Sequence, residues 1–130
     1  DIAARVKEIT EGKGVPVVYD SIGADTFEAS LASLSPRGMM VSFGQSSGPV
    51  TSFNPAVLAA GGSLYYTRPG LANYIATRED LELSGKRLFD VVGSGKVSIK
   101  VNQTYALTET GQAHRDLEGR KTTGSTVLLP

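Results

Sequence analysis

The chain has 130 residues, about the size of one domain, and can bury a modest hydrophobic core. Its 13 basic and 13 acidic side chains cancel, so no electrostatic footprint points to nucleic acid or to an anionic membrane surface as a partner. The absence of cysteine excludes disulfide bonds, a thiol nucleophile and a cysteine-ligated metal site. No apolar run approaches the roughly 20 residues that span a bilayer. We therefore expect a cytoplasmic protein without a membrane partner.

Helices and strands alternate through the first part of the chain. The sequence opens without Met inside an amphipathic helix that we expect to end at Gly12. A β-branched and aromatic run from Val15 to Ser21 then predicts a strand buried on both faces. Apolar residues at intervals of four and three after Asp25 predict a second helix, stopped by residues 36–38. A second strand is expected from Met39 to Phe43.

The same alternation then occurs once more. Ala56 to Ala60 is predicted as a short helix that leads through paired glycines to a strand from Ser63 to Thr67. Three strands that alternate with helices imply right-handed crossovers and a parallel sheet. Thr77 begins a long helix that is expected to stop at residues 93–95.

The last part of the chain has weaker patterns. Short strands are expected at Val97 to Val101 and at Tyr105 to Leu107. A helix from Glu109 to Gly119 and a final strand from Ser125 to Leu129 complete the chain.

Small and flexible residues follow each of the three alternating strands. They are Ser21 to Gly23, Gly44 to Gly48 and Arg68 to Gly70. In an open parallel sheet, ligands bind beyond the carboxyl ends of the strands, where such residues let the backbone approach a ligand and donate hydrogen bonds. The same residue types also suit ordinary turns between strands and helices, so a ligand site and simple turns both stay open at this point.

Four segments in order carry a resemblance to a known family. They are Val17 to Gly23, Gly38 to Gly44, Thr67 to Pro69 and Arg120 to Gly124. Together they resemble the C-terminal part of NADPH-dependent quinone oxidoreductases, which are zinc-independent members of the medium-chain dehydrogenase/reductase superfamily. The resemblance runs over the whole chain, 1–130, so the chain is expected to be a fragment of such an enzyme.

The resemblance implies an α/β fold in two parts. Residues 1–96 would form the second half of an NADPH-binding, Rossmann-type parallel sheet with flanking helices. Residues 97–130 would form a short β-containing tail that returns to a GroES-like catalytic domain, most of which the chain lacks. The sequence has no G-x-G-x-x-G loop for a pyrophosphate, so the fragment alone is expected to be weak or inactive.

The resemblance also implies an activity, a cofactor and a partner. The complete protein would transfer hydride from NADPH to a quinone, and it would form a homodimer through the edge strand Ser63 to Thr67. The residues implied to contact the cofactor are Ser21, Gly23, Phe43, Gly44, Gln45, Arg68 and Arg120. Hydride transfer requires an oriented nicotinamide rather than a protein nucleophile, so no catalytic acid or base is assigned.

Several alternatives stay open beside this interpretation. Asp20 is either a general base or ribose ligand, or a turn residue that caps main-chain amides, and the second role is favoured. His114 has no partners at metal-ligand spacing, and we expect no metal site. The rival functions are an enoyl or enone reductase of the same superfamily and a non-catalytic α/β binding or dimerisation module.

Overall fold

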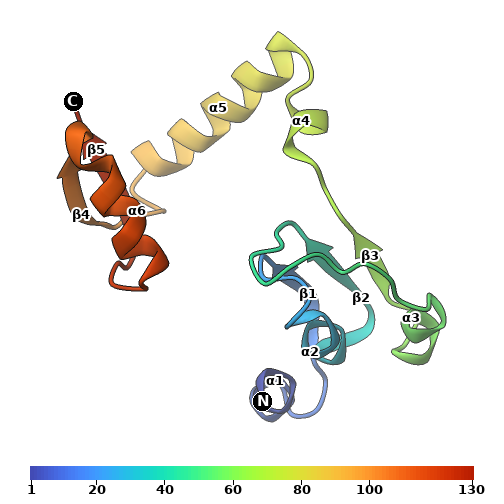
Figure 1. Ribbon diagram of the computed structural model, residues 1–130. Coiled ribbons are helices and arrows are strands. Elements are labelled where there is room, and N and C mark those ends of the chain that lie inside the picture. Colours follow the sequence, from blue (N-terminus) through green and yellow to red (C-terminus); the bar gives the residue numbers. More distant parts are fainter. The chain divides into compact units, whose positions relative to one another are not determined.

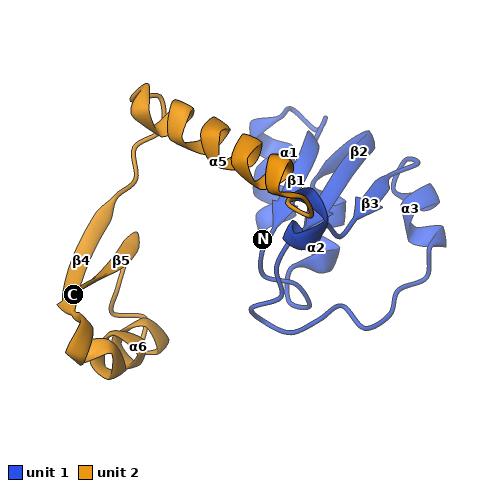
Figure 2. Cartoon of the chain, turned by 90° about the horizontal axis from the view of Figure 1, so that it is seen from above, with its two compact units in different colours: residues 1–74 blue, residues 75–130 orange.

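The computed structural model describes residues 1–130, which form two compact units, 1–74 and 75–130 (Figure 2). Unit 1 contains α1 (Ile2–Ile9), β1 (Val15–Asp20), α2 (Phe27–Ala32), β2 (Leu34–Ser42), α3 (Ala56–Ala60), β3 (Tyr65–Thr67) and α4 (Leu71–Tyr74). Unit 2 contains α5 (Arg78–Gly93), β4 (Val101–Ala106), the 3-10 helix η1 (Leu107–Glu109), α6 (Thr110–Glu118) and β5 (Ser125–Leu129). None of these helices combines the length and the apolar character that a membrane crossing requires.

The three strands of unit 1 form one parallel sheet in the order β1-β2-β3 (Figure 1). Val17 pairs with Met39, and Met39 pairs in turn with Tyr65. Each strand therefore lies beside the strand that precedes it in the chain, with helices in the connections. The α/β class and the parallel sheet expected from the sequence are confirmed.

The start of β2 differs from the prediction. The strand begins at Leu34, which already pairs with Val15, and the register then shifts before Val17 pairs with Met39. Proline is tolerated inside a sheet at such an irregularity, so Pro36 does not stop a helix here. Because β2 already begins at Leu34, α2 ends at Ala32, and the predicted strand of residues 39–43 covers only the second half of β2 and extends one residue beyond it, to Phe43.

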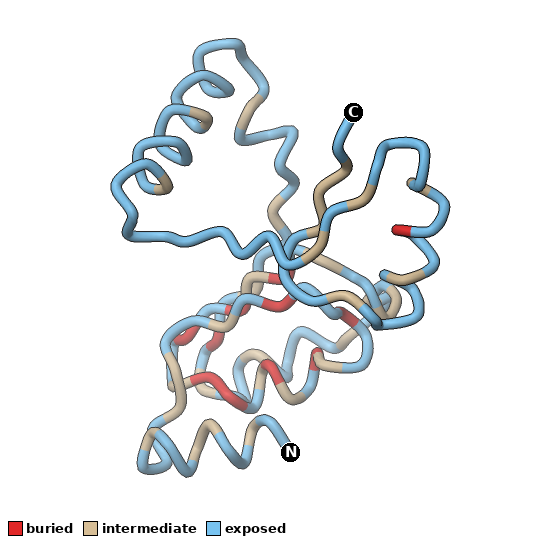
Figure 3. Tube along the Cα trace, turned by 90° about the vertical axis from the view of Figure 1, so that its left-hand side faces the viewer, coloured by how far each residue is buried: buried red, intermediate tan, exposed pale blue.

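The core of unit 1 lies on one face of its sheet. Phe27, Leu34, Met40 and Leu64 are buried together, and Phe53 and Tyr66 pack against them. The ring centroids of Phe27 and Phe53 are 5.0 Å apart, a distance typical of favourable aromatic pairs. Figure 3 shows the buried positions along the trace.

The prediction that β1 is buried on both faces is wrong. Val18 packs against the core on one face of β1. Tyr19 is 74% exposed on the opposite face, which it shares with Val17. Successive side chains of a strand point to opposite faces, and only one face of β1 is covered within this chain.

Unit 2 contains a two-stranded parallel sheet and two main helices. β4 pairs with β5, for example Tyr105 with Leu128, and Ala113 of α6 is buried beside them. The two short strands expected around residues 97–107 are one strand, because pairing with β5 extends only from Val101 to Ala106. The division at residue 96 concerns domains of a larger protein and stays a prediction.

Candidate functional site

Two turns lie against each other at the carboxyl edge of the β1-β2-β3 sheet. The turn after β1 accepts hydrogen bonds from the turn after β2, with Ser46 N donating to Ser21 O at 3.3 Å and Ser47 N to Ile22 O at 2.8 Å. In the opposite direction, Ala24 N donates to Gly48 O at 3.1 Å. The two turns therefore form a single backbone-linked edge, which is the place where open α/β sheets bind ligands.

Two glycines make this close approach of the turns possible. A Cβ atom at Gly44 would lie 2.3 Å from Ser21 O, and one at Gly23 would lie 2.4 Å from Gly48 O. Gly23 also has φ +97°, a backbone conformation that residues other than glycine rarely adopt. Any larger residue at either position would push the two turns apart.

Asp20, at the end of β1, fixes the conformation of the turn after β1 through hydrogen bonds to its carboxylate. Its carboxylate is buried and accepts hydrogen bonds from Ile22 N at 2.8 Å, Gly23 N at 3.0 Å, Thr26 Oγ1 at 2.8 Å and Ser30 Oγ at 2.6 Å. Burial raises the pKa of Asp20, but the hydrogen bonds from Ser30, Gly23, Thr26 and Ile22 together outweigh it and hold that pKa below its ordinary value. These contacts favour the turn-capping role over a general base.

Arg68, directly after β3, links β3 to the end of β2 and to the turn after β2 through hydrogen bonds. Its Nη1 donates to Ser42 O at 3.0 Å and to Gly44 O at 3.3 Å, while its Nη2 donates to Gln45 Oε1 at 2.9 Å. A small pocket of about 40 Å³ lies among these residues and Tyr66. Phe43, next to Gly44, keeps 55% of its surface exposed at the same edge.

Six of the seven predicted site residues therefore meet at one edge of unit 1. They are Ser21, Gly23, Phe43, Gly44, Gln45 and Arg68. The seventh, Arg120, belongs to unit 2, where it follows α6 with φ 55° and an exposed side chain. Within the chain, no three His, Asp or Glu side chains gather in a way that could hold a metal ion.

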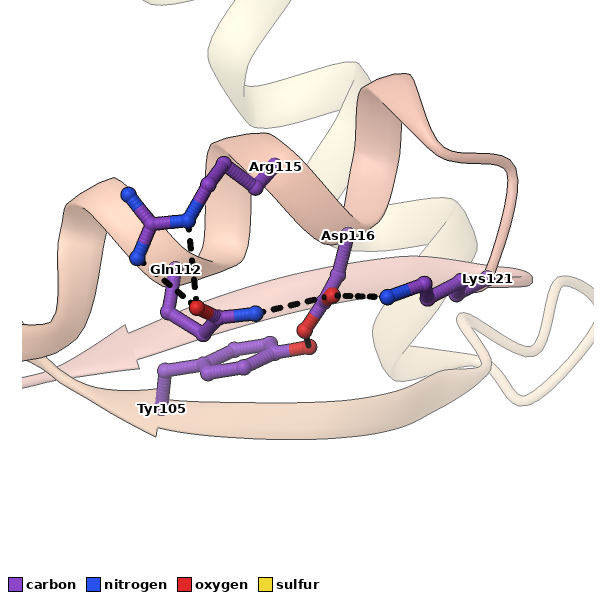
Figure 4. Close-up of polar contacts among 5 residues, drawn as sticks. All are labelled: Tyr105, Gln112, Arg115, Asp116 and Lys121. Carbon is purple, nitrogen blue, oxygen red and sulfur yellow. Dashed lines mark hydrogen bonds and ion pairs between the residues drawn. The ribbon is translucent and has the colours of Figure 1, made fainter.

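Sequence reasoning missed a polar cluster in unit 2 (Figure 4). Tyr105 Oη donates to Asp116 Oδ2 at 3.0 Å, Gln112 Nε2 donates to Asp116 Oδ1 at 2.9 Å, and Lys121 Nζ lies 3.3 Å from Oδ1. The hydrogen bond from Gln112, followed by that from Tyr105, lowers the pKa of Asp116, and the bond to Asp116 raises the pKa of Tyr105. The four-residue spacing of Gln112 and Asp116 on a helix was the available signal. The cluster attaches α6 to β4.

A parallel sheet with helices in its connections, whose turns meet at its carboxyl edge, is typical of one half of a Rossmann-type fold. The family model described as "Zinc-binding dehydrogenase" matches residues 1–128. The chain belongs to this family.

Three relatives illustrate the match. The quinone oxidoreductase of Pseudomonas aeruginosa is 52% identical over 130 residues, which are 100% of this chain and 40% of that protein. The solved structure of the Escherichia coli quinone oxidoreductase complexed with NADPH superposes with a TM-score of 0.90 at 51% identity, again covering 100% of this chain and 40% of the other. The 2-haloacrylate reductase of a Burkholderia species is 46% identical over 100% of this chain and 39% of its own length. The resemblance inferred from the four segments is thus confirmed, and the chain spans about 40% of the length of these relatives.

Proposed function

We propose that the chain is part of an NADPH-dependent oxidoreductase that transfers hydride from NADPH to a quinone. The observation that carries this proposal is the backbone-linked edge formed by the turns after β1 and β2, which lies where nucleotide cofactors bind in such sheets. The similarity to quinone oxidoreductases, including one complexed with NADPH, supports NADPH as the cofactor and a quinone as the acceptor. In this proposal residues 1–96 belong to the cofactor domain, residues 97–130 return to a catalytic domain, and the complete protein is cytoplasmic.

The proposed roles of the residues follow their positions. Ser21 and Gly23 line the cofactor cleft, while Phe43, Gly44 and Gln45 lie beside the nicotinamide and its ribose. Arg68 belongs to the same edge, and Arg120 reaches the cofactor. NADPH supplies the hydride when it is bound. The residues of this chain then orient the nicotinamide relative to the acceptor. Correct placement of these two reactants lowers the activation barrier to hydride transfer without an acid or base.

The roles of Phe43 and Arg120 are testable in the complete protein. We expect Phe43→Ala and Arg120→Met each to raise the dissociation constant for NADPH about 10-fold, through loss of apolar contact at Phe43 and of a charged donor at Arg120. A titration with NADPH that is monitored by fluorescence measures the dissociation constant. Arg78→Met is a matched control, because Arg78 forms an exposed ion pair with Glu82 on α5. Unchanged NADPH binding in both site variants would contradict the assigned roles.

A second candidate function is the reduction of an activated carbon–carbon double bond by the same hydride donor. The 46% identity to a 2-haloacrylate reductase favours it. Oxidation of NADPH by the complete protein, measured in parallel with a quinone and with a 2-haloacrylate, decides between the two. Turnover of neither compound would favour a non-catalytic binding or dimerisation module.

The proposed function includes a homodimer formed through β3. This strand pairs with β2 on one side only, and its other edge is free within the chain. A free edge presents unpaired N–H and C=O groups that a second copy can satisfy. We expect the complete protein to have the molar mass of a dimer in light scattering, and a monomeric mass would contradict this interface.

A further inference from the structure

Arg68 and Gln45 form a contact that fixes the direction of a side-chain amide. The three hydrogen bonds of the guanidinium hold Ser42 O, Gly44 O and Gln45 Oε1 in one group. The first two acceptors belong to the backbone at the end of β2, so the guanidinium itself has a defined position. Gln45 is attached to this fixed group through its oxygen.

The chemistry of the two side chains dictates which end of the amide points away. A guanidinium has only donors, so Gln45 must turn its oxygen toward Arg68 and its Nε2 in the other direction. Neither Nε2 nor the main-chain N–H of Gln45 has a partner within the chain. Gln45 therefore presents two nitrogen donors, with three N–H groups in total, at the carboxyl edge of the sheet, beside Gly23 of the turn after β1.

We propose that Gln45 donates a hydrogen bond to an oxygen of the bound ligand, and that Arg68 is a positioning residue that orients this amide without touching the ligand. This inference rests on the proposed function. The oxygen belongs either to the carboxamide of the nicotinamide or to the carbonyl of the electron acceptor, since both accept hydrogen bonds.

Four substitutions in the complete protein separate the two parts of the proposal. Gln45→Glu keeps an oxygen for Arg68 but replaces the donor with a second acceptor. Gln45→Leu removes donor and acceptor together. Arg68→Met leaves the donor in place but releases its orientation, and Arg68→Lys provides a second test with the charge retained. Melting temperatures show whether each variant is folded, and Arg78→Met again serves as the control.

We expect Gln45→Glu and Gln45→Leu to weaken ligand binding about 10-fold and Arg68→Met about 5-fold, as the loss of one oriented hydrogen bond implies. A higher dissociation constant for NADPH assigns the oxygen to the cofactor. A higher KM for the quinone at unchanged NADPH binding assigns it to the acceptor. The Gln45→Leu and Arg68→Met double variant should be no weaker than Gln45→Leu alone.

Gln45→Glu and Gln45→Leu are decisive together: the first keeps the link to Arg68 but adds a negative charge, and the second adds no charge, so weaker binding in both variants marks the missing donor. Unchanged NADPH binding and unchanged quinone KM in Gln45→Glu would overturn the donor role. Additive losses in the double variant would overturn the positioning role of Arg68 and favour direct contact. If the wild-type protein bound no NADPH and reduced no quinone, the proposed function itself would fail; losses in the variants alone test only this inference.

Discussion

The Gly44→Ala variant of the complete protein is expected to lose about 3 kcal/mol of unfolding free energy and most of its affinity for NADPH. A Cβ atom at this position would lie 2.3 Å from the carbonyl oxygen of Ser21 and 2.8 Å from its Cα. The obstacle is backbone rather than a flexible side chain, so the two turns must separate. Chemical denaturation and titration with NADPH measure the two effects.

Gly48→Ala is the matched control for this variant, because it changes a glycine in the same turn without a collision. Gly48 has φ +117°, and the nearest atom to a Cβ there is 4.0 Å away. Backbone strain alone should cost about 1 kcal/mol, with NADPH affinity largely kept. If Gly44→Ala were no more damaging than Gly48→Ala, the contact between the two turns would not hold the site together.

Asp20→Ala is expected to lower the unfolding free energy by about 3 kcal/mol and to weaken NADPH binding through disorder of the first turn. The substitution leaves the N–H groups of Ile22 and Gly23 and the hydroxyls of Thr26 and Ser30 without their shared acceptor. Chemical denaturation of the complete protein gives the free energy. Asp25→Ala, at an exposed carboxylate in the same connection, should cost about 0.5 kcal/mol or less. Equal effects of the two variants would refute the role of the buried carboxylate.

The pH dependence of stability gives a second readout of the Asp20 prediction. The pKa of Asp20 is lower in the folded protein than in the unfolded chain, so the ionised carboxylate stabilises the fold above the unfolded pKa, about pH 4. This contribution is lost as the pH falls from that value through the folded pKa. The difference in unfolding free energy between wild type and Asp20→Ala should therefore shrink below about pH 4. A difference that stayed constant into that range would contradict the assigned pKa shift.

Local sequence signals predicted most elements but not every boundary. Short-range patterns predicted α3 at Ala56–Ala60 and β5 at Ser125–Leu129 with their observed bounds. The start of β2 was missed because Pro36 is a helix breaker in isolation, whereas pairing of Leu34 with Val15 decides the actual structure. The burial of β1 was overestimated because a strand's sequence does not show whether other parts of the same chain cover both of its faces.

The location of the candidate site could be predicted from the sequence, but most of its side-chain contacts could not. Small residues after each strand predicted where the edge would lie, since turn chemistry is local. The turn chemistry of Asp20 predicted its bonds from the main-chain amides of Ile22 and Gly23. The bonds from Thr26 and Ser30, and the bond from Arg68 to Gln45, could not be predicted, because they depend on how α2 and β3 pack against the end of the sheet. The Tyr105–Asp116 contact in unit 2 likewise depends on the packing of α6 against β4.

Helix α5 differs from the core of unit 1 in what holds it together. None of its 16 residues is buried, and its defined interactions are the Thr77 cap and the ion pairs Arg78–Glu82 and Lys86–Asp90. Caps and exposed pairs contribute only fractions of a kcal/mol to about 1 kcal/mol each, and helices of this length are marginal in water. Its backbone amide protons are therefore protected from solvent exchange only to the extent that other apolar surface covers Leu81, Leu88 and Val91.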